Sequence, residues 1–356
     1  MTPLYRLLVE RIREGGPISV ADYMAECLLH PEHGYYASRE PFGVSGDFTT
    51  APEISQMFGE LIGLCLAQAW RDQGSPTAFT LAEIGPGRGT MMADLLRATR
   101  GVAGFHAALA LHLVEASPRL RTRQAAALAP HAAIWHDHPD TLPAAPLFLV
   151  ANEFFDALPI RQFRRDPQGW REILVGLTDG RLGFGLSDPL DPPGLAPRRA
   201  DTAPGQTVET CPAASAILSG IADRIARHGG AALIIDYGGW QSRGDTFQAV
   251  RHHAPADPLA EPGLADLTAH VDFAALAAAA RQAGAVPTAL TPQAVLLDRL
   301  GIAARAAKLA AGLSGAALAS HRAAYRRLTD PAEMGQLFQA LALHPPGTPP
   351  PPGFDA

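Results

Sequence analysis

The feature that most constrains this chain is a run of three glycines at every second position. They lie in the segment Leu81-Ala82-Glu83-Ile84-Gly85-Pro86-Gly87-Arg88-Gly89-Thr90, where an apolar stretch predicts a strand, and residues 91–98 then predict a helix. Glycine lets the backbone turn with positive φ and lets a ligand approach without meeting a Cβ atom. A helix N-terminus presents free N–H groups to such a ligand. The segment therefore predicts a strand, a ligand-binding loop and a helix.

The spacing of these glycines narrows the choice of ligand. A dinucleotide fingerprint is G-x-G-x-x-G, whereas this loop is G-x-G-x-G. An acidic residue before the first glycine suits a ligand that carries an amino group and a sulfonium. The pattern is typical of the S-adenosylmethionine (SAM) loop of Rossmann-like methyltransferases, and a generic strand–turn–helix is the alternative. The residues expected to bind this cofactor are Glu83, Gly85, Gly87, Gly89 and Thr90.

Other apolar runs also end in polar residues. The runs 109–114, 132–135, 146–151 and 231–235 are followed by Glu115, by Asp137, by Asn152 and Glu153, and by Asp236 and Tyr237. Open α/β sheets bind ligands at the carboxyl ends of their strands. Glu115 is expected to hold the ribose hydroxyls of the cofactor, and Asn152 to contact its amino group or the substrate. Asp137 either faces the adenine edge or is a solvated loop acid.

The composition argues against several classes of protein. The chain has 356 residues, of which 47% are hydrophobic, which is enough for a sizeable core. A net charge of −6 gives no electrostatic basis for nucleic-acid binding. No apolar run reaches the length of a membrane span. The three cysteines are too scattered for a zinc site, and the pair His30 and His33 lacks a third ligand, so we expect no bound metal.

The N-terminal residues bear on the expected compartment. Residues 1–14 have the pattern of an amphipathic helix in which Arg6, Arg11 and Arg13 are balanced by Glu10 and Glu14. A transit peptide is poor in acids, and a signal peptide has an apolar stretch and a cleavage site. Neither is visible, and the few cysteines fit a reducing compartment. We therefore expect a cytoplasmic protein, or a matrix protein only if the source is eukaryotic.

The chain divides into three parts by pattern. Residues 1–76 form a partly helical extension that is expected to contribute to the roof of the active site. Residues 77–344 form the nucleotide-binding domain, with insertions near 160–210 and 240–275. The tail 345–356 is rich in proline and is expected to be disordered.

Two segments inside the large domain have clear local patterns. Residues 170–177 and 181–186 flank Asp179-Gly180, which predicts a β-hairpin. The segment 213–228 predicts a helix. A longer alanine-rich helix is expected over 293–313.

Three further segments carry a specific resemblance. They are Ser45-Gly46-Asp47-Phe48-Thr49-Thr50-Ala51-Pro52-Glu53-Ile54-Ser55, Ala151-Asn152-Glu153-Phe154-Phe155-Asp156-Ala157-Leu158-Pro159, and Pro262-Gly263 with Ala265-Asp266-Leu267-Thr268-Ala269-His270-Val271-Asp272-Phe273. With the glycine loop, they resemble the MidA-like family of SAM-dependent methyltransferases over residues 15–343. The resemblance implies a Rossmann-like class I α/β fold with a seven-stranded, mostly parallel sheet. It also implies SAM as cofactor, with S-adenosylhomocysteine as product.

The same resemblance implies a substrate. Mitochondrial members of the family assemble respiratory complex I and act as protein arginine methyltransferases. The implied reaction here is symmetric dimethylation of an arginine on a complex I core subunit. A homodimer is left open.

The chemistry of arginine methylation singles out carboxylates. A guanidinium is a poor nucleophile while its electrons are delocalised, and a carboxylate can bind two of its nitrogens and orient it. Glu153 is the best candidate because it ends the fourth strand. Further candidates for catalysis are Asn152, Asp156 and His270. Those for the substrate pocket are Asp47, Phe48, Glu53, Asp236 and Tyr237, although a structural role in a cap, a turn or the core is an alternative for several.

Two other functions remain open from the sequence. A small-molecule methyltransferase would have the same cofactor loop. An assembly chaperone that binds SAM without turnover would also resemble this family, although a decayed site would be expected to lose some of the residues Glu115, Asn152 and Glu153.

Overall fold

The computed structural model describes residues 1–38 and 49–355. The expected pocket residues Asp47 and Phe48 lie outside these ranges. Contacts divide the chain into two units. The extension unit comprises Met1–Phe48, Asp156–Ala214 and Gln241–Asp272, and the core unit comprises Thr49–Phe155, Ser215–Trp240 and Phe273–Ala356.

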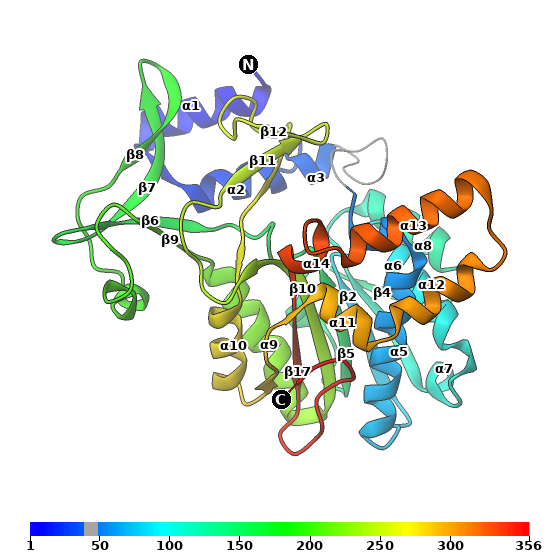
Figure 1. Ribbon diagram of the computed structural model, residues 1–356. Coiled ribbons are helices and arrows are strands. Elements are labelled where there is room, and N and C mark those ends of the chain that lie inside the picture. The colour runs from blue at the N-terminus through cyan, green and yellow to red at the C-terminus, as the bar shows by residue number, and fades with distance from the viewer. Residues whose placement is uncertain (39–48, 356) are drawn as a thin grey trace. The chain divides into compact units, whose positions relative to one another are not determined.

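The core unit is built on a mainly parallel sheet (Figure 1). Its strands follow the order β15–β17–β10–β5–β2–β3–β4, a path of seven strands within the described residues. Their bounds are β2 Phe79–Ile84, β3 Leu109–Val114, β4 Ala133–His136, β5 Leu147–Asn152, β10 Gly230–Gly239, β15 Val286–Pro287 and β17 Phe338–His344. Neighbours from β10 to β4 are parallel, whereas β17 is antiparallel to β10 and β15 is antiparallel to β17. This arrangement confirms the expected Rossmann-like, mostly parallel sheet. Two further short strands pair beside the seven-strand path, so the sheet has nine strands within the described residues.

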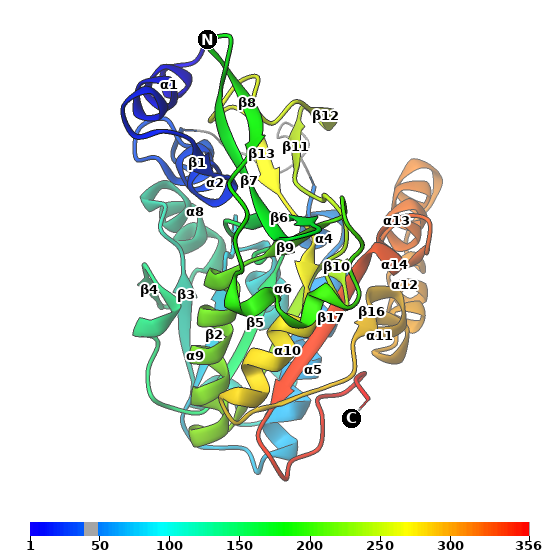
Figure 2. The same ribbon diagram turned by 90° about the vertical axis from the view of Figure 1, so that its left-hand side faces the viewer.

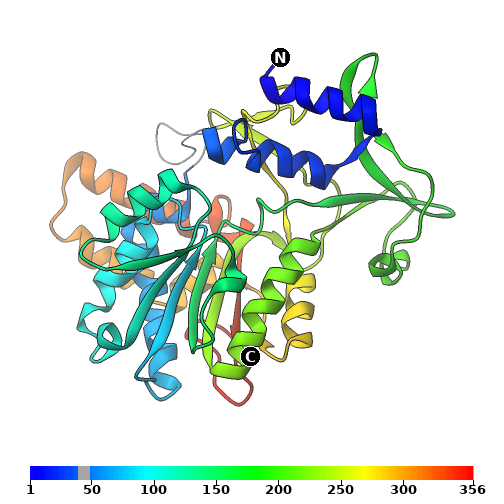
Figure 3. The same cartoon turned by 180° about the vertical axis from the view of Figure 1, so that it is seen from behind.

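Helices cover both faces of this sheet, with α9 and α10 on one side and α5 on the other (Figures 1 and 3). The helices of the core unit are α4 Ala51–Ile54, α5 Gln56–Asp72, α6 Thr90–Ala98, α7 Phe105–Ala108, α8 Pro118–Leu128, α9 Pro212–His228, α10 Phe273–Gln282, α11 Gln293–Arg299, α12 Ile302–Ala310, α13 Gly315–Thr329 and α14 Met334–Leu337. The helix expected at 213–228 is confirmed as α9. The one expected over 293–313 is interrupted, because Gly301 has a φ of 87° between α11 and α12.

The central strands are buried on both faces. Every residue of β2 and of β5 is buried, as expected for parallel strands covered by helices on each side. Aromatic rings pack against one end of β2: the ring of Phe79 lies 5.3 Å from that of Phe148 and 5.0 Å from that of Phe105. This packing fixes β2, and therefore the position of the loop that follows it.

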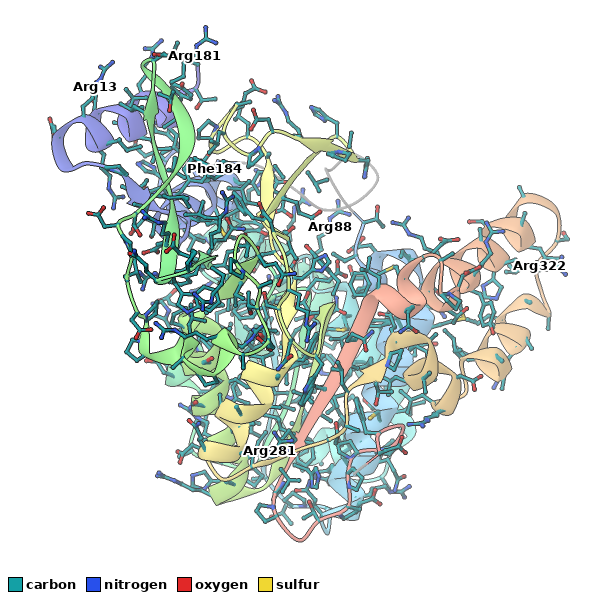
Figure 4. The ribbon with its side chains drawn as sticks, turned by 60° about the vertical axis from the view of Figure 1, so that its left-hand side comes forward. Arg13, Arg88, Arg181, Phe184, Arg281 and Arg322 are labelled. Carbon is teal, nitrogen blue, oxygen red and sulfur yellow. The ribbon has the colours of Figure 1, made fainter. Side chains whose placement is uncertain are left out.

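The extension unit contains helices and two small sheets. It includes α1 Pro3–Gly15, α2 Val20–Leu29, α3 Tyr35–Ser38, β1 Ile18–Ser19, β6 Arg161–Asp166, β7 Gly169–Thr178, β8 Arg181–Leu186, β9 Thr207–Thr210, β11 Gln248–Arg251, β12 Ala254–Ala256, β13 Asp266–Thr268 and β14 Val271–Asp272. The predicted hairpin is confirmed as β7 and β8 (Figure 2). Its turn residues Asp179 and Gly180 have φ values of 51° and 76°, as a tight hairpin turn requires, and Arg181 lies beside the turn (Figure 4).

Two expected boundaries differ from the structure. Residues 49–76 belong to the core unit rather than to a separate extension over 1–76, because α5 packs on the sheet. The tail, which we expected to be disordered, is ordered over 345–355: Phe354 is buried, and Asp355 forms an ion pair with Arg299. These contacts offset the entropy cost of ordering a proline-rich segment.

No helix in the described part of the chain is both long and apolar enough to cross a membrane.

A buried carboxylate joins three helices of the core unit. Glu60 on α5 accepts hydrogen bonds from Arg97 on α6 at 3.0 Å and from Arg305 on α12 at 2.6 and 2.9 Å. Burial opposes ionisation of Glu60, but the two guanidinium groups outweigh it and lower its pKa. The cluster holds α6, the helix that follows the glycine loop.

We expect Glu60→Ala to lower the free energy of unfolding by about 3 kcal/mol, because it leaves two cations without their shared anion. Urea denaturation measures this loss. Folding lowers the pKa of Glu60. The difference in the free energy of unfolding between wild type and Glu60→Ala is therefore present above its usual pKa of 4.5 and disappears as pH falls below that value. Asp72→Ala, at an exposed acid on the same helix, is the matched control. A loss below about 1 kcal/mol at neutral pH would contradict the role of Glu60.

Candidate active site

The glycine loop has the conformation that its sequence predicts. Gly85, Gly87 and Gly89 have φ values of 67°, 52° and 83°, all in the region that favours glycine. Gly89 is the N-cap of α6. A Cβ atom at Gly85 would lie 3.1 Å from the ring of Phe154, so a side chain here would be crowded as well as strained by the positive φ. The positive φ values turn the chain sharply between β2 and α6, so the loop lies at the N-terminus of α6, where ligands commonly bind.

Two buried acceptors lie at the carboxyl ends of neighbouring strands. Oε2 of Glu83, on β2, and Oδ1 of Asn152, on β5, have no hydrogen-bond partner among the residues that the structure describes. Burial raises the pKa of Glu83 to about 8, against a backbone hydrogen bond from Met92. A buried acceptor without a donor is costly. A ligand with an amino group and a positive charge supplies the chemistry that this pair lacks, so these residues fit SAM.

Glu115 follows β3 and is held by neighbouring donors. Its carboxylate accepts from the backbone N–H of Ser117 at 2.8 Å and from the side-chain amide of Gln124 at 3.1 Å. Burial raises its pKa, and these hydrogen bonds oppose that rise. Asp137, the other candidate for this region, is exposed and forms an ion pair with Arg121 at 2.5 Å. Glu115 is therefore better placed than Asp137 for the contact with a ligand that is expected of an acid at a strand end.

Glu153 has a strained backbone at the end of β5. Its φ is 51°, which is uncommon for a residue other than glycine, asparagine or aspartate, and such strain occurs often at functional sites. Oε1 of Glu153 accepts from the backbone N–H of Ala51 and from the amide of Asn152, both at 3.1 Å. The strain and these contacts fix the carboxylate immediately after the strand.

Glu53, expected in the substrate pocket, instead binds the glycine loop. Its carboxylate accepts from the hydroxyl of Thr90 at 2.6 Å and pairs with Arg88 at 3.4 Å (Arg88 is labelled in Figure 4). The hydroxyl of Thr90, which was expected to bind the cofactor, thus donates a hydrogen bond to Glu53. The short helix α4 therefore makes two contacts. Its Glu53 binds the glycine loop, and the backbone of its Ala51 donates to Glu153.

Asp236 has a positioning role rather than an exposed place in a pocket. Its side chain is fully buried. Oδ2 accepts from the backbone N–H groups of Phe154 and Phe155 at 3.2 and 2.9 Å, and Oδ1 accepts from that of Tyr237 at 2.9 Å. Asp236 therefore holds the turn that carries Glu153. Tyr237 is half-buried.

Two of the expected catalytic residues belong to the extension unit. Asp156 is buried, and its backbone carbonyl accepts from the N–H of Ala269 at 3.0 Å. The backbone N–H of His270 donates to Thr246 at 2.8 Å, and burial lowers the pKa of the imidazole. A neutral imidazole can accept a proton. The catalytic roles of Asp156 and His270 stay predictions.

Sequence analysis missed one buried polar residue of this region. Gln124, on α8, contacts both the glycine loop and Glu115. A single glutamine in a helix gives no periodic or motif signal, so only the fold could identify it. Within the described ranges, no group of three or more histidine, cysteine or acidic residues could hold a metal.

The raised pKa of Glu83 has a measurable consequence. Between the usual pKa of 4.5 and about 8, the folded protein keeps a proton that the unfolded chain has lost. We expect the free energy of unfolding of the cofactor-free protein to fall as pH rises through this window, and Glu83→Gln to flatten that fall. Urea denaturation at several pH values tests this. Glu14→Gln, at an exposed acid, should leave the slope unchanged, and an unchanged slope in Glu83→Gln would contradict the assignment.

Comparison with known proteins agrees with this geometry. Residues 61–291 match the model of a family described as S-adenosyl-L-methionine-dependent methyltransferases. A solved structure from Burkholderia thailandensis, bound to S-adenosyl-homocysteine, is 31% identical with a TM-score of 0.83, and the match covers 99% of this chain and 92% of that one.

Curated relatives match over nearly the whole chain. The Drosophila melanogaster homolog of the mitochondrial protein arginine methyltransferase NDUFAF7 is 37% identical over an alignment of 374 positions, which covers 96% of this chain and 85% of the relative. The Homo sapiens protein is 36% identical over an alignment of 378 positions, which covers 97% of this chain and 84% of the relative. The fold, the glycine loop and these matches agree, and the chain belongs to the MidA-like family of S-adenosyl-L-methionine-dependent methyltransferases.

Proposed function

We propose that this enzyme transfers the methyl group of SAM to an arginine side chain of a protein substrate. The observation that carries the proposal is the fixed carboxylate of Glu153, at the end of the strand beside the glycine-loop strand. The names of the curated relatives, which are protein arginine methyltransferases, support the choice of acceptor.

The cofactor is proposed to lie along the carboxyl ends of β2, β3 and β5. The glycine loop would bind the amino-acid part of SAM. Glu83 and Asn152 would accept hydrogen bonds from its amino group, and Glu115 would accept from the ribose hydroxyls. When bound, SAM supplies an electrophilic methyl group on a positively charged sulfur. The exposed ion pair of Asp137 makes it the weakest of the proposed cofactor contacts.

Glu153 is proposed to bind and orient the guanidinium. A carboxylate can accept from two guanidinium nitrogens at once, which fixes the plane of the group and draws positive charge toward those nitrogens. The third nitrogen is then placed in line with the methyl group, and positioning of this kind contributes up to about 7–11 kcal/mol. The nitrogen gains a methyl group and loses a proton. His270 is the proposed candidate for accepting that proton, and Asp156 is proposed as a second-rank carboxylate for the guanidinium.

The finer proposals follow from the family resemblance. We propose a respiratory complex I core subunit as the acceptor and symmetric dimethyl-arginine as the product. The curated relatives are named as mitochondrial proteins. The cytoplasmic location expected from the sequence, and the homodimer, stay predictions.

We expect Glu153→Gln to lower the rate of arginine methylation by about a hundredfold, because the amide cannot accept from two guanidinium nitrogens. Binding of S-adenosylhomocysteine, measured by calorimetry, should change much less than the rate. Glu14→Gln, at an exposed acid on α1, is the control. Wild-type turnover in Glu153→Gln would contradict the proposed role.

A second experiment tests the acceptor. Mass spectrometry of complex I core subunits should show loss of a dimethyl-arginine in cells without this gene, and wild type should restore it. Gly87→Val should not, because valine is strained at a φ of 52° and fills the approach to the loop. Gly74→Val is the matched control, since Gly74 has a φ of 83° with open space around it and precedes the opposite end of β2. An unchanged arginine in the deleted strain would contradict the proposed acceptor.

A further inference from the structure

The side-chain amide of Gln124 links three parts of the core unit. Gln124 lies on α8 and has no exposed surface. Its Nε2 donates to the carbonyl of Gly87 at 2.8 Å and to Oε2 of Glu115 at 3.1 Å. Its Oε1 accepts from the indole N–H of Trp135 at 2.8 Å. The same amide therefore contacts the glycine loop, the acid after β3 and strand β4.

The partners determine which way the amide faces. An indole N–H can only donate, so the atom opposite Trp135 must be the amide oxygen. A backbone carbonyl and an ionised carboxylate can only accept, so the atom facing Gly87 and Glu115 must be the amide nitrogen. Both N–H groups are then used, one by the loop and one by the acid. No other uncharged side chain of this size offers two donors and an acceptor in this arrangement.

Gln124 also lies close to the third glycine of the loop. A Cβ atom at Gly89 would lie 3.4 Å from Cα of Gln124 and 3.5 Å from its Cγ. These are ordinary van der Waals distances, so α8 passes close to the loop at this residue. Gln124 thus bonds to one of the three loop glycines, lies close to another, and bonds to the acid expected to face the ribose.

We propose that Gln124 is a positioning residue for the cofactor, which holds the Gly87 carbonyl and the Glu115 carboxylate in the geometry that SAM requires. The inference rests on the cofactor site proposed above. Without Gln124, Glu115 would keep its bond from Ser117 but lose the donor that faces its other oxygen. The Gly87 carbonyl would be left without its side-chain donor, and the loop would lose a restraint where its φ is 52°.

The test is a double-mutant cycle in the affinity of the full-length protein for S-adenosylhomocysteine, measured by calorimetry. Gln124→Met keeps the length of the side chain and removes all three hydrogen bonds. It should weaken binding by about tenfold to a hundredfold, as expected for the loss of a hydrogen bond to a charged group. In a Glu115→Gln background the same substitution should cost clearly less, because the carboxylate through which Gln124 acts is absent.

Two further variants keep the test decisive. Trp135→Phe removes the indole donor but leaves both donors of Gln124, so it should weaken binding less than Gln124→Met. Gln124→Glu is nearly isosteric and serves if Gln124→Met does not fold; it faces Glu115 with a second acid and should also weaken binding at neutral pH. In kinetics, either Gln124 variant should raise the KM for SAM more than it lowers kcat.

The outcomes separate this inference from the proposed site. If Glu115→Gln leaves the affinity unchanged, the proposed cofactor site is wrong. If Glu115→Gln weakens binding but the Gln124 variants do not, the site stands and the role of Gln124 is overturned. Equal costs of Gln124→Met in both backgrounds would also overturn the proposed joint role, because Gln124 would then not act through Glu115.

Discussion

The parallel pairing of β2 with β3 on one side and with β5 on the other is the constraint on which the rest of the site depends. Parallel strands end at the same edge of a sheet, so residues distant in the sequence meet there. The glycine loop, Glu115 and Glu153 follow these three strands directly, and Asn152 is the last residue of β5. Burial of β2 and β5 on both faces packs these strands between the covering helices, which helps to fix the positions of their ends.

Two buried glutamates of the core unit show how one type of side chain can serve stability at one position and binding at another. Glu60 is surrounded by two arginines, and its pKa is lowered. Glu83 is equally buried, but burial raises its pKa and no cationic group of the described residues counters that rise. An acceptor left without a donor costs about 1–3 kcal/mol. A fold keeps such a group where a ligand provides the missing partner, and the family's cofactor is a cation of the required kind.

The sequence was sufficient to predict the sheet, the glycine loop and the acids at strand ends, because each follows from local periodicity or from a motif. It could not assign Glu53, Asp236 or Gln124. Their roles depend on hydrogen bonds to residues 37 to 82 positions away, which no local pattern encodes. The order of the tail was missed for a similar reason, since Phe354 and Asp355 are held by residues of α11 and the core.

The central claim is that three strand ends place the cofactor with its sulfur toward Glu153. A crystal structure of this protein with S-adenosylhomocysteine tests it most directly. The account predicts ribose hydroxyls on the Glu115 carboxylate, the amino group near Glu83 or Asn152, and the sulfur facing the Glu153 side chain. A ligand whose ribose lies away from Glu115, or whose sulfur is turned from Glu153, would contradict it.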